Sequence, residues 1–337
     1  MKKNSILFLL ICLVYSLSGC GHKECEYKRH LDVKVGQAPQ LVFHRYEDVL
    51  FNLDTANFQQ ELMRIQQDYK PFLGGDLTNP AAVKYLKDFA TDSYCISMYG
   101  KVKKAFPNNK EIEEMVSEVY QHFNYYYPDI QLPTTIFTCV SGISLDNGSV
   151  IVSDDYVVLS LDWFLDHDEV YEQIGMPVYM QHRTVKQYLA RELGLQLYLR
   201  YVYQWRKQTN LLDEMVNAGK IAYFVEAMCP SISEETLLGY SPEQMQWANE
   251  NEGNIWADLV GNQRLYETGL EMYRTFLSDG PFTQEYSNEA PARLGEFIGL
   301  HIVRSYISAN EDVTLQNMMR NNDLQGIFQK SNYKPKK

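Results

Sequence analysis

VYMQHRTVKQYLARELGLQLYLRYVYQW, residues 178–205, is the most apolar helical pattern in the chain. Apolar residues recur in it at every third or fourth position, and others fill much of the remaining circumference. The main stripe consists of Val178, Val185, Leu189, Leu193, Leu197 and Tyr201, and the others are Tyr188, Leu195, Leu199 and Val202. A helix that is apolar on most sides is covered by other helices. We therefore expect one central helix over 178–205, with the rest of the fold packed around it.

Further helices are expected on both sides of this stretch. Apolar residues have helical spacing in 55–69 and 109–126, and Asn79-Pro80 has the order of an N-cap followed by a first helical residue. Ser241-Pro-Glu-Gln244 is a capping box that opens another helix. Gly295-x-x-x-Gly299 lies in a later apolar helix that also carries charged residues, which favours close packing between two soluble helices over a membrane dimer.

The period of the pattern changes between residues 135 and 161. The runs 135–140 and 156–161 are rich in β-branched and aromatic residues, and the apolar residues around 143–152 flank a hairpin signal, Asp146-Asn-Gly148. The chain is therefore expected to be α+β and mostly α-helical, with a small three-stranded sheet ahead of the buried central helix. No linker divides it, so we expect a single globular domain over 41–337.

The N-terminus has the order of a bacterial lipoprotein signal. Lys2 and Lys3 precede an apolar run, residues 6–17, which is too short to span a bilayer. Leu17-Ser-Gly-Cys20 then fits a lipobox, whose cysteine is lipidated before cleavage. The alternative is an ordinary secretory signal with a chance cysteine. We expect a signal peptide over 1–19, a lipid on Cys20 and a polar tether over 20–40.

Charge restricts the partners of the mature chain. Removing Lys2 and Lys3 from 31 basic residues leaves 29 against 43 acidic ones, an excess of 14 negative charges. Such a chain does not bind nucleic acid or an anionic membrane by charge alone. The membrane is thus expected to be reached through the lipid on Cys20, and other partners are expected to be envelope proteins.

Four cysteines of the mature chain remain besides Cys20. They are Cys25, Cys95, Cys139 and Cys229. An oxidising envelope permits a disulfide, and four cysteines allow three pairings. The alternative is that they are isolated buried thiols that act as small apolar side chains.

The motifs of common catalytic and metal sites are missing. The seven histidines are scattered, with no pair at the four-residue spacing that places two imidazoles on one helix face, and His22 and His30 fall in the expected tether. The acidic clusters 154–155 and 166–169 lack the alternating ligands of a calcium loop. We expect no metal and no cofactor.

A series of short motifs runs in order from about residue 150 to 336, behind the lipobox. It includes VVLSLDWFL (157–165), LLDEMVNAGKIAYF (211–224), Gly239-Tyr240 with Gln244 and Trp247, Asn251-Glu252 with Ile255-Trp256, Leu265-Tyr266, Gly280-Pro-Phe282, APARLGEFIG (290–299), IVRSY (302–306) and SNYKPK (331–336). In these motifs the chain resembles the gliding-motility lipoprotein GldB family of Bacteroidetes.

That family is similar in turn to predicted zinc proteases, so the resemblance implies a zincin-like helical body. In those proteases a His-Glu-x-x-His helix supplies two zinc ligands and a general base, and a Glu before a Gly supplies a third ligand. The corresponding positions here are Arg191, Glu192, Leu195 and Ala218. Only Glu192 keeps its residue, so the resemblance implies a degenerate metal site without ligands.

Two classes of function follow. The first is a non-catalytic lipoprotein that serves as a scaffold or binding component of a gliding-motility-type or related envelope assembly, anchored in the outer membrane and facing the periplasm. The second is an envelope hydrolase or peptidase with an unrecognised site, for which Glu192 is the candidate residue. The missing ligands favour the first, and we expect no enzymatic activity.

Overall fold

The computed structural model describes residues 26–143 and 148–335. Short helical turns are η1 (Glu26–His30), η2 (Leu161–Trp163) and η4 (Arg264–Tyr266), and η3 (Tyr198–Val202) is π-helical. The strands are β1 (Val42–Arg45), β2 (Thr135–Cys139), β3 (Val150–Val152) and β4 (Tyr156–Ser160). The helices between β1 and β2 in the chain are α2 (Tyr46–Leu50), α3 (Phe58–Ile65), α4 (Lys70–Leu73), α5 (Pro80–Thr91), α6 (Ser93–Ala105) and α7 (Lys110–Tyr126). Those that follow are α8 (Val170–Gln173), α9 (Val178–Gln181), α10 (Tyr188–Leu197), α11 (Leu211–Met228), α12 (Glu234–Leu238), α13 (Pro242–Gly261), α14 (Leu270–Leu277), α15 (Leu294–Ala309), α16 (Leu315–Arg320) and α17 (Leu324–Ser331).

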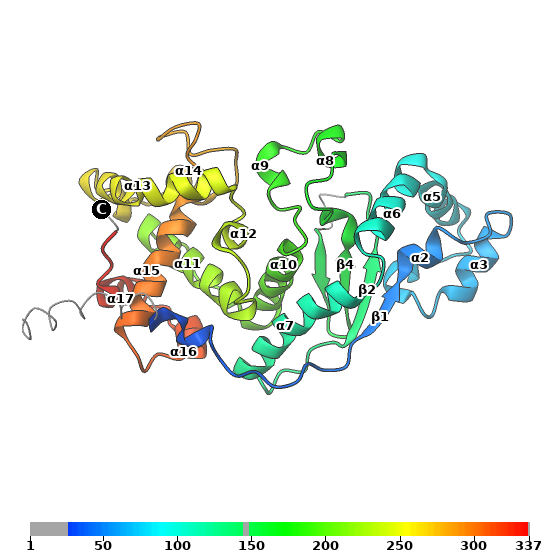
Figure 1. Ribbon diagram of the computed structural model, residues 1–337, viewed down its shortest axis with the longest axis horizontal. Coiled ribbons are helices and arrows are strands. Elements are labelled where there is room, and N and C mark those ends of the chain that lie inside the picture. Colours follow the sequence, from blue (N-terminus) through cyan, green and yellow to red (C-terminus); the bar gives the residue numbers. More distant parts are fainter. Residues whose placement is uncertain (1–25, 144–147, 336–337) are drawn as a thin grey trace, which may run out of the picture.

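The fold is α+β and mostly helical, as the sequence predicts. Figure 1 shows α11 to α17 gathered at one end of the long axis, and the sheet with α2 to α6 at the other. Helices α7 and α10 lie between them. Asn79 caps α5 by accepting a hydrogen bond from the backbone N–H of Ala81, and the capping box of Ser241 and Gln244 opens α13. Both helix starts are confirmed.

The sheet has four strands in the order β1-β2-β4-β3. Strands β1, β2 and β4 are parallel, and β3 pairs antiparallel with β4 at one edge. Successive side chains of β2 and β4 enter two different apolar clusters. Ile136 and Val157 pack toward α7 and α10, whereas Phe137 and Val158 pack toward α2 to α5. Both faces are therefore buried, which explains why these strands read as continuous apolar runs.

The predicted three-stranded sheet has one strand too few, and most of the hairpin signal at 146–148 lies outside the described residues. Strand β1 was missed because its residues are only partly buried and show no alternation of apolar and polar residues. The described hairpin joins β3 to β4 through a turn at 153–155, where the Ser153 N–H donates to the Tyr156 carbonyl at 2.9 Å. Residues 144–147 lie outside the described chain.

The central helix is shorter than the prediction of 178–205. The chain forms the single turn α9, leaves the helix over 182–187, and continues as α10 and η3. The break is fixed by the loop before α8, because the Asp166 N–H donates to the Thr184 carbonyl and the Lys186 N–H donates to the Asp166 carboxylate. Leu193 and Leu197 are fully buried, whereas Val178 is 71% exposed. The central position is confirmed for α10 and wrong for α9.

Helices α11 and α15 pack closer than side chains would allow. A Cβ added to Gly219 would lie 2.1 Å from the carbonyl carbon of Gly299, and one added to Gly299 would lie 1.8 Å from the carbonyl oxygen of Met215. Only glycine fits at these two positions. The interpretation of Gly295-x-x-x-Gly299 as a site of close packing between two helices of the fold is thus confirmed. None of the described helices is long and apolar enough to cross a membrane.

The predicted polar tether over 20–40 is wrong from residue 26 on. Turn η1 packs on the C-terminal end of α15, where Arg29 Nη2 donates to the Asn310 carbonyl at 2.6 Å. Leu31 and His30 are buried, and Leu31 belongs to the main apolar cluster. Residues 1–25, with Cys20, His22 and Cys25, lie outside the described chain. The other three cysteines are free and buried, as one of the two interpretations predicts.

Candidate functional site

The two polar residues of the predicted degenerate site stand side by side on α10. Arg191 is only 9% exposed, although arginine is rarely buried without a partner. Its Nη1 donates to Glu192 Oε1 at 2.7 Å, and its Nε donates to the Leu237 carbonyl at 3.3 Å. Its Nη2 lies 3.9 Å from Glu296 Oε1 on α15. The guanidinium of Arg191 thus connects three helices.

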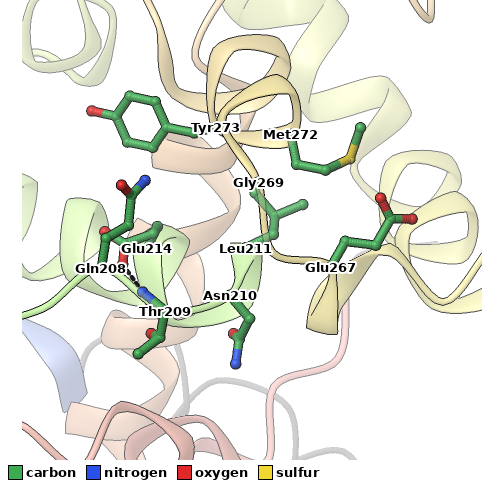
Figure 2. Close-up of a pocket in the computed structure, with 9 residues that line it drawn as sticks. All are labelled: Gln208, Thr209, Asn210, Leu211, Glu214, Glu267, Gly269, Met272 and Tyr273. Carbon is green, nitrogen blue, oxygen red and sulfur yellow. Dashed lines mark hydrogen bonds between the residues drawn. The ribbon is translucent and has the colours of Figure 1, made fainter.

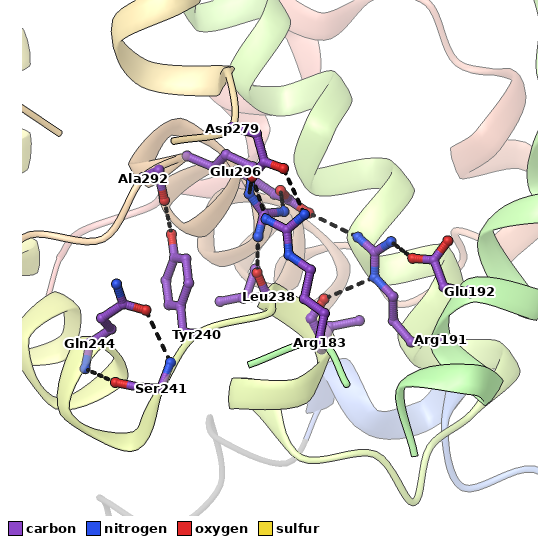
Figure 3. A network of polar contacts seen from close by, with 12 residues as sticks. Arg183, Arg191, Glu192, Leu238, Tyr240, Ser241, Gln244, Asp279, Ala292 and Glu296 are labelled. Atoms are coloured by element: carbon purple, nitrogen blue, oxygen red, sulfur yellow. Dashed lines mark hydrogen bonds and ion pairs between the residues drawn. The ribbon is translucent and has the colours of Figure 1, made fainter. Parts of the chain in front are cut away.

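Two further arginines lie next to Arg191, and together we call them the arginine cluster: Arg183, Arg191 and Arg293 with Glu192, Asp279 and Glu296. Figure 3 shows the carboxylates among the guanidinium groups. Arg183 forms a bidentate pair with Asp279, in which one hydrogen bond is 2.6 Å. Arg293 Nη1 donates to Glu296 Oε2 at 2.7 Å, and its Nε lies 3.2 Å from Asp279. The three positive guanidinium groups and the three negative carboxylates give the cluster a net charge of zero.

The backbone around Gly239 is shaped for this cluster. Arg191 and Arg293 donate to the carbonyls of Leu237 and Leu238, which end α12 and would otherwise lack partners. Gly239 has φ 66°, and a Cβ there would lie 3.1 Å from Arg183 Nε. Glycine is needed because of both the left-handed backbone and the approach of the arginine. This accounts for Gly239 in the sequence resemblance.

Electrostatic effects in the cluster favour the charged forms. Burial works against a positive Arg191, but the neighbouring Tyr188, Glu192 and Glu296 raise the pKa of its guanidinium above the ordinary value. Burial alone would raise the pKa of Asp279, yet the hydrogen bond and charge of Arg183 lower it. The cluster is therefore a set of ion pairs, and Glu192 pairs with Arg191, the residue at one of the positions where the sequence resemblance implies a zinc ligand.

The remaining positions of the predicted site do not join Arg191 and Glu192 in a ligand shell. Leu195 packs against the main apolar cluster. Ala218 lies on α11, but Gly194 of α10 faces Val225 and Met228, two turns further along that helix. Among the described residues, no three His, Cys, Asp or Glu side chains are grouped so as to hold a metal ion.

The space beside the cluster is small. A hollow between Tyr240 and Asp279 has a volume of about 10 Å³, which is room for about one water molecule. A second hollow of about 10 Å³ lies where the start of α11 meets the start of α14, between Asn210, Glu267 and Tyr273, as Figure 2 shows. A larger cavity of about 390 Å³ lies beside η1, away from Arg191. Neither of the two small hollows can hold a peptide or a sugar.

A second polar network, which the sequence analysis missed, joins several residues of the resemblance. His301 Nδ1 lies 2.7 Å from Glu252, and its Nε2 lies 3.3 Å from Glu234. Tyr333 donates to Glu252 at 2.8 Å, and Arg304 donates to Glu234 at 2.8 Å. We call this the His301 network. It ties α12, α13, α15 and the C-terminal segment together, and no short motif announces it because its members are far apart in the chain.

Buried charge in the His301 network is stabilised by pairing. Burial alone would lower the pKa of the His301 imidazole, but its hydrogen bonds to Glu234 and Glu252 outweigh this and raise it. Burial would likewise raise the pKa of Glu234, yet His301 and Arg304 lower it to about 2. Both carboxylate contacts therefore favour a protonated His301.

A family model described as gliding motility protein GldB matches residues 28–335. No curated protein and no solved structure matches the chain. The matched range begins within η1 and ends at the last described residue, so it includes the arginine cluster and the His301 network. The chain therefore belongs to the family of the gliding motility protein GldB.

Proposed function

We propose that this protein is a non-catalytic envelope lipoprotein that serves as a scaffold or binding component of a gliding-motility-type or related assembly. Family membership supports the gliding-motility-related envelope role. The observation that supports a non-catalytic role is the hydrogen bond of 2.7 Å from Arg191 to Glu192. Glu192 is the only residue that the resemblance leaves for chemistry, and its carboxylate is engaged in an ion pair.

The surroundings of Glu192 also disfavour hydrolysis. A metal-assisted mechanism needs three protein ligands and an open position for water. At the corresponding positions Arg191 brings a positive charge that repels a metal cation, and Leu195 and Ala218 offer no lone pair. The adjacent hollow is too small for a substrate. We infer that the polar groups of this site hold α10, α12 and α15 together and do not carry out a reaction.

The attachment to the envelope is proposed from the lipobox. Cys20 carries the lipid, and it is followed by Gly21 instead of an acidic residue that would retain a lipoprotein in the inner membrane. The proposed location is therefore the periplasmic face of the outer membrane. Other envelope proteins are the proposed partners, and neither a metal nor a cofactor takes part.

Replacing Glu192 by Gln tests the non-catalytic role. Glutamine keeps a carbonyl oxygen that can accept from Arg191 but cannot act as a base at neutral pH. We expect Glu192→Gln to restore full function in a host strain that lacks the gene. Glu296→Gln is the matched control, because Glu296 is a carboxylate of the same cluster outside the base position. Loss of function in Glu192→Gln alone, with both variants folded, would show that the protein is an enzyme.

Elemental analysis provides an independent readout. The soluble body without residues 1–20 is expected to contain far less than one zinc per chain after dialysis. Stoichiometric zinc would overturn the proposal, whatever the outcome in the host strain.

A further inference from the structure

The N-terminal end of the described chain is fixed to one end of the molecule. Arg29 of η1 donates to the carbonyls of Ile307 and Asn310 at the end of α15. Tyr223 on α11 donates to the Tyr27 carbonyl at 2.7 Å, and Tyr126 on α7 donates to the His30 carbonyl at 2.5 Å. Hydrogen bonds from three helices therefore fix η1 in place, so residues 26–30 are not part of a long flexible linker.

The distance from η1 to the lipid is limited by chain length. Only five residues, 21–25, separate Cys20 from Glu26. Six steps of at most about 3.5 Å span roughly 20 Å. Once Cys20 is in a bilayer, the start of η1 is within that distance of the membrane surface. Rotation about this short connection moves the far end of the molecule and leaves η1 near the lipid.

The surface around η1 has the chemistry of a membrane-facing surface. Tyr125 is 49% exposed at the rim of the 390 Å³ cavity, with its ring edge-on to Tyr126 at 4.9 Å. Tyrosine favours the interface because its ring is apolar and its hydroxyl is polar. Residues 27–34 carry three basic side chains against one acidic side chain, so the strong negative charge of the whole chain is absent here. Glu311 and Asp312 on another wall of the cavity keep this surface near neutral.

We propose that the end of the molecule with η1, Tyr125 and α16 faces the bilayer, and that the end with α5 and α6 points away from it. Figure 1 shows these two ends at opposite sides of the long axis. The partner of the first surface is the lipid surface that holds Cys20, contacted by Tyr125 and the rim of the cavity. The inference rests on the proposed lipidation of Cys20. The far end is then the one presented to soluble envelope partners.

Energy transfer to labelled lipid tests this orientation. The full lipoprotein is reconstituted in phosphatidylethanolamine–phosphatidylglycerol vesicles that contain an acceptor-labelled lipid. A donor dye is placed on Tyr125→Cys or on Tyr85→Cys, the latter on α5 and 71% exposed. Cys25→Ser is present in both, and the buried Cys95, Cys139 and Cys229 are left unchanged. We expect markedly greater transfer from position 125 than from position 85.

Two controls separate this inference from the proposed function. A flexible spacer of about 20 Gly and Ser residues after Gly21 is expected to keep vesicle binding and to abolish the difference between the two positions. Cys20→Ala is expected to abolish vesicle binding itself. If the parent protein fails to float with vesicles, the lipid anchor is wrong. If it floats but transfer is equal at both positions or greater at Tyr85, the orientation is wrong.

Discussion

The imidazole of His30 lies between the rings of Tyr126 and Tyr223, with centroid distances of 6.3 and 6.0 Å. Its Nδ1 is 3.1 Å from the Tyr223 hydroxyl. Burial, together with the charge of Arg29, lowers the pKa of this histidine to about 4. The packing of η1 against the helices therefore favours the neutral form of His30.

This lowered pKa predicts that acid weakens the docking of η1. Well above pH 6.5 His30 is neutral in both the folded and the unfolded chain. As the pH falls from 6.5 to about 4, His30 of the unfolded chain binds a proton before His30 of the folded chain does. The free energy of unfolding therefore falls by up to roughly 3 kcal/mol. His30→Gln removes this contribution. Urea unfolding of the soluble body at pH 7.5, 6, 5 and 4 should show a shallower loss of stability in the variant, and equal slopes would contradict the prediction.

Single residues also show why the site was only partly predictable. The resemblance identifies Arg191 and Glu192, which the fold brings into contact because they are adjacent on α10. It does not identify Arg183 or Asp279, which are 96 residues apart and meet only in the folded chain. His30 was assigned to a tether because the tyrosines that enclose it, Tyr126 and Tyr223, are far from it in the sequence.

Among the elements, α10 buries seven of its residues in the middle of the fold, so substitutions on its buried side should lower stability. Leu197→Ala should lower the free energy of unfolding by roughly 2–5 kcal/mol, because Leu197 is fully buried and the substitution leaves a cavity. Val178→Ala on α9 is the matched control and should change it by less than about 0.5 kcal/mol. Thermal or urea unfolding measures both. A large effect at Val178 would mean that α9 is covered in solution.

The periodicity that predicted 178–205 as one helix holds for α10 and fails for α9, and the reason is physical. The spacing of apolar residues indicates which side of a helix is buried. The break at 182–187 instead depends on two hydrogen bonds to Asp166, one from its N–H to the Thr184 carbonyl and one from the Lys186 N–H to its carboxylate. The glycines of α11 and α15 were more informative. Gly295-x-x-x-Gly299 indicated a close helix contact, although the sequence does not reveal that Gly219 is its partner.

On the scale of the whole molecule, residues 26–40 belong to the folded body. A fragment that starts at residue 41 should therefore be less stable than one that starts at residue 21, by several kcal/mol, because it exposes the apolar surface under Leu31 and leaves buried tyrosine hydroxyls unpaired. Arg29→Ala in the longer fragment is expected to reproduce part of this loss. Thermal unfolding compares the three proteins, and identical midpoints would restore the view of a loose tether.

The contact between Arg29 and the Ile307 carbonyl joins positions 278 residues apart. A protein exported from its N-terminus cannot make this contact until α15 has also left the export channel. Under the proposed lipidation of Cys20, η1 has no docking site until α15 has left the export channel. We therefore expect acylation and cleavage to be finished before η1 packs against the end of α15.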